Sequence, residues 1–170
     1  MRDRTVVDTN VLVTANGRAT HVEAACQLRC VDELARITRE EVVCVDDKGL
    51  ILREYQRQTE SVGQAQPGTV FFKHVWQKMG DTRRVRLIPV DPIGREGREF
   101  SHPALPRNNL KKDAKFLAVA LNADAAIVNA TDSDWAEHRE LTDRMGVDVK
   151  QLCPRHAIRP GKSSGDRASE

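Results

Sequence analysis

Short apolar runs rich in β-branched residues alternate with amphipathic segments along most of the chain. Five such runs have the length and composition of strands: 5–7, 42–45, 85–90, 125–130 and 147–152. The segments between them place apolar residues at helical spacing, over 21–37, 50–55, 70–79, 111–123 and 135–145. Strands that alternate with helices predict a mostly parallel sheet covered on both faces, so we expect an α/β fold.

The remaining segments are predicted to be connections. Residues 9–13 would form the exit loop of the first strand, 61–68 a polar loop, and 91–109 a long irregular connection rich in Pro and Gly. Residues 155–170 lack periodicity and are predicted to be a disordered tail, which leaves one domain over 1–154. No apolar run approaches the roughly 20 residues of a membrane helix, and no secretory signal is evident, so we expect a cytoplasmic protein.

Charge and cysteine content narrow the function classes further. The net charge is only +2, but residues 83–115 hold nine basic residues against four acidic ones, so a basic surface is expected there. That stretch is either a solvated face or a track for a nucleic-acid backbone.

The four cysteines show no Cys-x-x-Cys spacing and are expected to be reduced and packed. Cys26 and Cys30 are spaced to share a soft metal, but with no neighbouring His pair they would make a poor zinc site.

Acidic residues follow two of the predicted strands. Asp8 comes directly after 5–7, and Asp132 and Asp134 come after 125–130. Because the carboxyl ends of parallel strands meet at one edge of a sheet, these side chains are expected to lie together. Glu54 and Asp113 share helical faces with apolar residues and should point inward.

Electrostatics limits what such a cluster can do. Two carboxylates about 4 Å apart repel by roughly 4 kcal/mol at an effective dielectric near 20, so several together require a cation or raised pKa values. Oxygen ligands without a converging His or Cys suit Mg²⁺ or Mn²⁺ rather than zinc. Such ions activate water and neutralise charge on a phosphate during hydrolysis.

Four stretches together resemble the PIN domain family. They are Val7 to Val13, Lys112 to Leu121, Ala125 to Asp134, and Gly146-Val147 before Cys153-Pro154. Their order and spacing cover about residues 5–154. The resemblance implies a three-layer α/β/α sandwich with a mostly parallel central sheet, and a metal-dependent endoribonuclease that cuts single-stranded RNA. Many small single-domain members are toxins paired with an antitoxin, so an antitoxin or other protein partner is plausible, as are a homodimer and a housekeeping or defence nuclease.

The resemblance also implies roles for individual residues. Asp8, Glu54, Asp113 and Asp132 match the catalytic metal-binding acids, and Asp134 matches a frequent additional acid. Thr9 and Asn10 match residues that support the first acid by hydrogen bonding, and Thr131 lies directly before the fourth acid. The chain departs from the family at Ala130, where many relatives carry Ser or Thr. Arg107, Lys111, Lys112 and Lys115 are the cations expected to guide the RNA.

Simpler interpretations of the same residues stay open at this point. Asp8 alone could form a turn, Asp113 could favour a helix start by its charge, and Asp134 could be an N-cap. Glu54 could be an ordinary solvated residue, with Glu33, Glu40 and Glu41 competing for its role. The histidines share no ligand spacing and are expected to be structural or on the surface, and Trp76 and Trp135 to be core or interface anchors.

A catalytically degenerate PIN-like module that binds RNA or protein is the alternative function. A phosphatase with an aspartyl intermediate is disfavoured, because Asp8-Thr9-Asn10 lacks the Asp-x-Asp pattern.

Overall fold

A parallel five-stranded sheet forms the centre of the molecule in the computed structural model, which describes residues 2–60, 65–94, 98–102 and 110–157. Its strands lie in the order β3-β2-β1-β6-β7. Their bounds are β1 Arg4–Val7, β2 Val42–Asp46, β3 Val85–Ile88, β6 Ala126–Asn129 and β7 Val149–Gln151. All four pairings are parallel, which confirms the predicted α/β class with a parallel central sheet.

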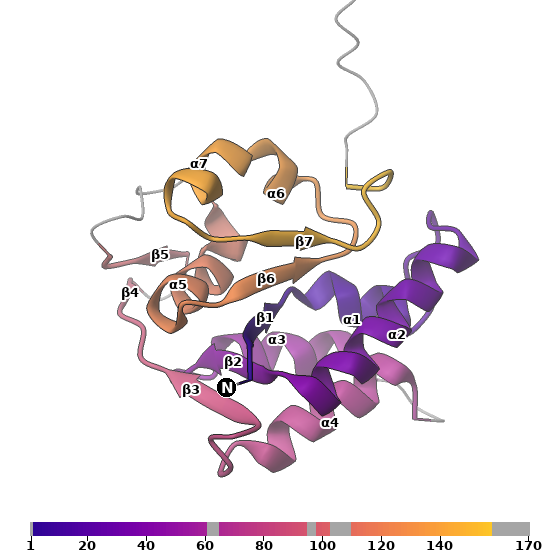
Figure 1. The fold of residues 1–170 in the computed structure, drawn as a ribbon, viewed down its shortest axis with the longest axis horizontal. Coiled ribbons are helices and arrows are strands. Elements are labelled where there is room, and N and C mark those ends of the chain that lie inside the picture. Colours follow the sequence, from indigo (N-terminus) through magenta and orange to yellow (C-terminus); the bar gives the residue numbers. More distant parts are fainter. Residues whose placement is uncertain (1, 61–64, 95–97, 103–109, 158–170) are drawn as a thin grey trace, which may run out of the picture.

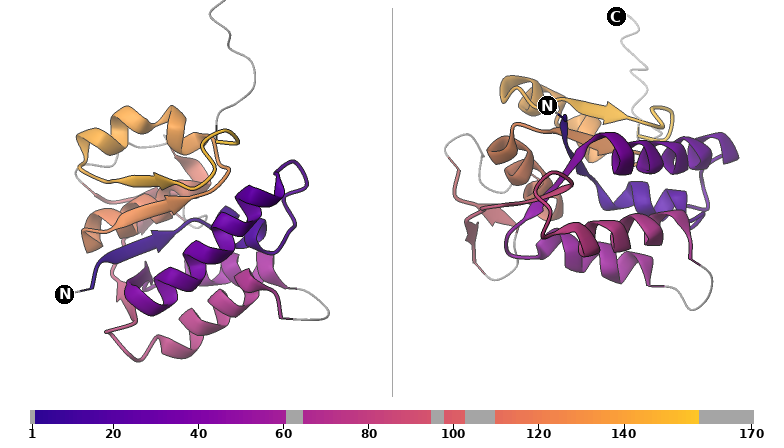
Figure 2. Two further views of the ribbon diagram at one scale, coloured as in Figure 1. Left: turned by 45° about the vertical axis from the view of Figure 1, so that its right-hand side comes forward. Right: turned by 60° about the horizontal axis from the view of Figure 1, so that its bottom comes forward.

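Helices cover both faces of this sheet. Figure 1 shows α1 to α4 gathered on one side of the strands and α5 to α7 on the other, and the two views of Figure 2 agree. Right-handed crossovers require this arrangement, because the chain moves outward from β1 to β3 and then returns past β1 to reach β6. The helices are α1 Thr9–Ala15, α2 Ala24–Glu40, α3 Leu50–Thr59, α4 Pro67–Lys78, α5 Ala114–Ala123, α6 Asp134–Glu137 and α7 Arg139–Arg144. Among the described helices, none is long and apolar enough to cross a membrane.

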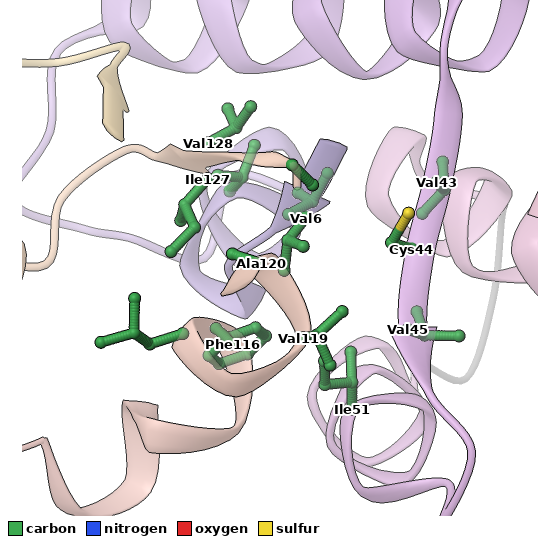
Figure 3. Packing of buried hydrophobic residues seen from close by; sticks show 14 of the residues in the cluster. Val6, Val43, Cys44, Val45, Ile51, Phe116, Val119, Ala120, Ile127 and Val128 are labelled. Atoms are coloured by element: carbon green, nitrogen blue, oxygen red, sulfur yellow. The ribbon is translucent and has the colours of Figure 1, made fainter. Parts of the chain in front are cut away.

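The core lies between the sheet and its helices. Strand residues such as Val6, Cys44 and Ile127 are fully buried, and so are Phe116 and Val119 of α5 (Figure 3). Helix α5 is apolar around most of its circumference, with eight of its ten residues buried, because it packs against β1, β2, β3 and β6. This packing fixes the start of α5 next to the ends of the central strands.

Three predicted segments differ from the structure. Residues 9–13, expected to be a loop, belong to helix α1, whose N-cap is Asp8. β-branched Val11, Val13 and Thr14 gave it a weak helical signal, and packing against α2, α3 and α4 overrides that propensity. The 91–109 connection contains a short antiparallel pair, β4 Pro92–Ile93 with β5 Glu99–Phe100. The single helix expected over 135–145 is divided at His138 into α6 and α7.

The C-terminal segment also departs from expectation. Residues 155–157, expected to be part of a disordered tail, continue a turn in which the N–H groups of His156 and Ala157 donate to the carbonyl of Cys153. Residues 158–170 of the predicted tail lie outside the described residues.

Cys153 forms a disulfide with Cys26 of α2, so the prediction that all four cysteines are reduced is wrong. The two cysteines are 127 residues apart in sequence, and only the tertiary fold brings them together.

Candidate metal centre

The candidate site lies at the point in the sheet where the strand order reverses direction. Strands β1 and β6 are neighbours, yet the helices that follow them cover opposite faces, so their carboxyl ends form the crevice where α/β sheets bind ligands. Asp8 follows the last residue of β1, and Asp132 lies three residues after the end of β6. Asp113 ends the 3₁₀ turn η1 (Lys111–Asp113) that leads into α5.

Three of the predicted acids meet at this point. Asp8, Asp113 and Asp132 each present a carboxylate oxygen, and these oxygens lie within 4.8 Å of one another. Asp8 and Asp113 are buried, each with 3% of its surface exposed, while Asp132 is partly exposed. The Oδ2 atom of Asp113 is inaccessible to solvent and has no hydrogen-bond partner in the described part of the chain. A buried carboxylate oxygen without a partner costs free energy unless something else satisfies it.

The electrostatics of the cluster reflects this crowding. Burial raises the pKa of Asp113 to about 8, and the negative charges of Asp8 and Asp132 raise it further. The positive charges of Lys112 and Lys115 lower it, but by less. Burial also raises the pKa of Asp8 to about 6, opposed by the hydrogen bond from Trp135 and helped by the charge of Asp132. Both shifts favour the neutral forms of these acids, and a bound cation would favour the charged forms instead.

Two asparagines hold the segment that carries Asp132. Asn10 Oδ1 accepts the backbone N–H groups of Ala130, at 2.9 Å, and Thr131, at 3.1 Å. Asn10 Nδ2 donates to Asn129 Oδ1 at 2.8 Å, and the same oxygen accepts the N–H of Asp132 at 3.2 Å. Asn129 is fully buried, and sequence reasoning gave it no role. The sequence did contain a signal for this role: Asn129 ends an otherwise apolar strand, and a buried amide side chain needs hydrogen-bond partners.

A second group of contacts fixes Asp8. The Nε1 of Trp135, which is 1% exposed, donates to Asp8 Oδ2 at 2.6 Å, and the N–H of Asn10 donates to Oδ1 at 3.3 Å. The hydroxyl of the buried Tyr55 donates to the carbonyl of Val7. The prediction of Trp135 as a core anchor is confirmed, and it has the further task of orienting an acid. Trp76 instead is 55% exposed, on α4.

Glu54 occupies a different position from the other three acids. It belongs to α3 and is close enough for its charge to raise the pKa of Asp8, but it is not among the carboxylates within 4.8 Å. Its Oε2 lies 2.7 Å from Lys115 Nζ, and Lys115 also donates to the carbonyl of Lys112. Lys115, predicted to help guide RNA, is only 6% exposed, so its ammonium group is directed into the fold. It neutralises Glu54 instead, since a buried ammonium needs a charged partner.

The other predicted supporting residues act mainly through their backbones. Thr9 is buried, and its hydroxyl has no hydrogen-bond partner among residues 2–60, 65–94, 98–102 and 110–157, so it does not support Asp8 as predicted. Thr131 contributes its N–H to Asn10. The N–H of Asp134 donates to Asp132 Oδ1 at 2.9 Å, which orients that acid, while the Asp134 carboxylate lies outside the set of three. Asp134 begins α6, and the N-cap position belongs to Ser133.

Two of the predicted RNA-contacting cations are exposed beside the site. Lys111 and Lys112 precede Asp113 directly, and both are exposed. Partial burial lowers the pKa of Lys112, but the negative charges of four nearby carboxylates have the larger combined effect and raise it. These carboxylates belong to Asp113, Asp132, Asp8 and Asp134. Arg107 lies outside the described residues.

The glutamates that competed for the role of Glu54 lie elsewhere. Glu33, Glu40 and Glu41 all pair with Arg36 of α2, and Glu33 also pairs with Lys150 at 2.8 Å. These contacts lower the pKa of Glu33 despite its burial. The paired glutamates therefore have cationic partners, whereas no ion pair involves Asp8 or Asp113 among the described residues.

The donor set and the orphaned oxygen of Asp113 fit a hard divalent cation. All three side chains offer oxygen, as Mg²⁺ and Mn²⁺ prefer, and such an ion would satisfy Asp113 Oδ2 and offset the repulsion. The sequence matches no protein-family model, and a search of curated proteins finds no similar one. The resemblance to the PIN domain therefore remains a prediction, and the site has to be interpreted from its own geometry.

Proposed function

We propose that this protein is a Mg²⁺- or Mn²⁺-dependent endoribonuclease that hydrolyses phosphodiester bonds of single-stranded RNA. The observation that carries the proposal is the convergence of Asp8, Asp113 and Asp132 around a buried, unpartnered oxygen of Asp113. Parallel-sheet proteins bind ligands at this edge, and three carboxylates with exposed lysines beside them suit a phosphate bridged by a cation. The resemblance to the PIN domain supports the same reaction and a PIN-like three-layer arrangement.

Each residue has a distinct task in this proposal. A bound divalent ion supplies Lewis acidity toward the phosphate and lowers the pKa of water. Asp8 and Asp113 provide buried carboxylates for the ion, and Asp132 provides a third from the rim of the site. Trp135, Asn10 and Asn129 hold two of these acids in place through the hydrogen bonds described above. Lys112 places an ammonium next to the carboxylates, where an RNA phosphate would approach.

The alternative function is a catalytically degenerate PIN-like module that binds RNA or protein. Pairing of Glu54 with Lys115 favours it, because the fourth predicted acid is then neutralised. We favour the nuclease, since the other three acids have no such cationic partner in the described contacts and would be costly to keep in a module that needs no ion. A cytoplasmic location, an antitoxin or other protein partner, and a homodimer belong to this proposal as expectations from the resemblance.

Cleavage of labelled single-stranded RNA tests the proposal directly. Wild-type protein stripped of metal with EDTA should be inactive, and Mn²⁺ or Mg²⁺ should restore cleavage whereas Ca²⁺ should restore less, because Ca²⁺ polarises water more weakly. Asp113→Asn should abolish cleavage while leaving the circular dichroism spectrum unchanged. Glu33→Gln is the matched control, as it changes a buried acid that already has partners.

The outcomes separate the two functions. RNA binding by gel shift with no cleavage over a wide range of both metals would support the degenerate module. Equal cleavage by wild type and Asp113→Asn would contradict this site for any nuclease.

A further inference from the structure

The cysteines form a second candidate centre that shares no residue with the acidic cluster. Cys26 and Cys30 lie one turn apart on α2, and Cys153 lies in the turn after β7. The sulfurs of all three are within 4.8 Å of one another, and all three residues are buried. A disulfide uses only Cys26 and Cys153, which leaves Cys30 as a free thiol beside it.

A histidine follows the last of these cysteines in the same turn. His156 follows Cys153 by three residues, and its N–H donates to the Cys153 carbonyl at 2.9 Å. Its Nε2 is buried without a hydrogen-bond partner in the described chain, and it lies 4.0 Å from a carboxylate oxygen of Glu23. The spacing Cys153-x-x-His156 together with Cys26-x-x-x-Cys30 is close to that of structural zinc sites. In the sequence, Cys26 and Cys30 alone made a poor site, and no pattern connected them with Cys153 and His156, because 122 residues separate Cys30 from the turn that begins after Leu152.

We propose that the protein with its disulfide reduced binds one zinc ion through Cys26, Cys30 and Cys153, with His156 as the fourth ligand. Zinc–sulfur bonds of about 2.3 Å place tetrahedral thiolates roughly 3.8 Å apart, within the 4.8 Å that encloses the three sulfurs, and the two joined in the disulfide must separate after reduction. The imidazole is outside the 4.8 Å set and must rotate toward the sulfurs. The ion would join the start of α2 to the segment after β7, as the disulfide does.

Two arguments favour a metal over a disulfide alone. A disulfide gives no task to Cys30 or to the unpartnered nitrogen of His156, whereas a four-ligand ion uses both. A reducing compartment, as expected for an RNA-cutting enzyme, would also keep Cys26 and Cys153 as thiols.

Cobalt(II) reports on this site and not on the carboxylates. A trialkylphosphine first reduces the disulfide to two thiols and becomes phosphine oxide, with the oxygen taken from water; excess reagent is removed before Co²⁺ is added. Binding then releases the three thiol protons. A thiolate-to-cobalt charge-transfer band in the near ultraviolet arises only from sulfur ligands, so Co²⁺ on Asp8, Asp113 or Asp132 contributes nothing to it. We expect the band to saturate at about one Co²⁺ per chain and to disappear when Zn²⁺ displaces it.

Variants identify the ligands. Cys30→Ser should weaken Co²⁺ binding by at least about tenfold and reduce the charge-transfer band. Cys44→Ser is the matched control, because Cys44 is also a buried free thiol, in β2, and this variant should behave like wild type. His156→Ala should keep the charge-transfer band but weaken binding and change the visible d–d bands, which depend on the fourth ligand.

Other outcomes would overturn the proposal. No charge-transfer band in the reduced wild type, or equal binding by Cys30→Ser and Cys44→Ser, would exclude a three-thiolate site. An unchanged visible spectrum in His156→Ala would exclude His156. If reduction unfolds the protein, Zn²⁺ should restore the circular dichroism spectrum, and a failure to do so would also contradict the site. None of these measurements depends on ribonuclease activity.

Discussion

Two clusters in this molecule contain buried carboxylates in opposite surroundings. Glu33, 7% exposed, has Arg36 and Lys150 within 2.8 Å, and its pKa is lowered. Asp113, 3% exposed, faces Asp8 and Asp132, and its pKa is raised to about 8. Folding therefore stabilises the charged form of one acid and the neutral form of the other. The difference separates a structural acid from a candidate ligand more clearly than burial does, because only the unpaired cluster requires something from outside the chain.

Metal binding should show the largest contrast between the two clusters. Asp113→Asn should abolish Mn²⁺ binding in isothermal titration calorimetry, because it removes one of three ligands and the charge that attracts the ion. Glu33→Gln should leave Mn²⁺ affinity unchanged. If both variants bound Mn²⁺ as the wild type does, the acidic cluster would not be a metal site.

Stability should change in the opposite direction. In EDTA at pH 8, Asp113→Asn should raise the free energy of unfolding by on the order of 1–3 kcal/mol, since it removes a buried charge from a repelling group. Glu33→Gln should lower it by about 1–2 kcal/mol, because Arg36 and Lys150 lose a partner but are themselves accessible to water. Urea denaturation of both variants measures the two effects. A loss of stability in Asp113→Asn would contradict the repulsion inferred here.

The pH dependence of stability sharpens the same comparison. A raised folded pKa gives stability that is present below the ordinary value of 3.8 and is lost as pH rises through about 6 for Asp8 and about 8 for Asp113. The metal-free protein should therefore lose stability between pH 4 and pH 8, on the order of 3–6 kcal/mol for the cluster as a whole. The lowered pKa of Glu33 acts in the other direction, with stability present above 4.5 and lost on acidification. Saturating Mn²⁺ should remove the decline above pH 6, and urea titrations across the range in EDTA or Mn²⁺ provide the check.

Glu54 lies between the two kinds of acid, since it is near the cluster but paired with Lys115. Glu54→Gln should weaken Mn²⁺ binding by less than tenfold, through its charge alone. Lys115→Met should strengthen Mn²⁺ binding by a few-fold, because it leaves the Glu54 charge unneutralised next to the site. Lys73→Met, at an exposed position of α4, is the control for loss of a positive charge. A loss of binding in Glu54→Gln as large as that in Asp113→Asn would show that Glu54 ligates the ion after all.

The same comparison explains what the sequence could and could not reveal. Asp8, Asp113 and Asp132 were predictable, because strand ends and a helix start have fixed places in a parallel sheet. No comparable rule predicts from the sequence which residues will form an ion pair or a disulfide. The contact between Glu54 and Lys115 joins α3 to α5, and the disulfide of Cys26 joins α2 to the turn after β7, so both depend on tertiary distances that local patterns do not encode. Helix α1 was missed because its β-branched residues favour a strand, and packing decides otherwise.

The hydrogen bond from Trp135 to Asp8 should have the smallest effect and the most specific one. Trp135→Phe removes the Nε1 donor from Asp8 Oδ2, which stabilises the charged carboxylate, so the pKa of Asp8 should rise further above about 6. Mn²⁺ affinity should fall by a few-fold at pH 6, where the ion must displace that proton, and the deficit should shrink as pH approaches 8. Trp76→Phe, on the exposed face of α4, should leave affinity unchanged at both values. A deficit of equal size at pH 6 and pH 8 would mean that Trp135 positions the carboxylate sterically and does not tune its proton affinity, which calorimetric titration at the two pH values distinguishes.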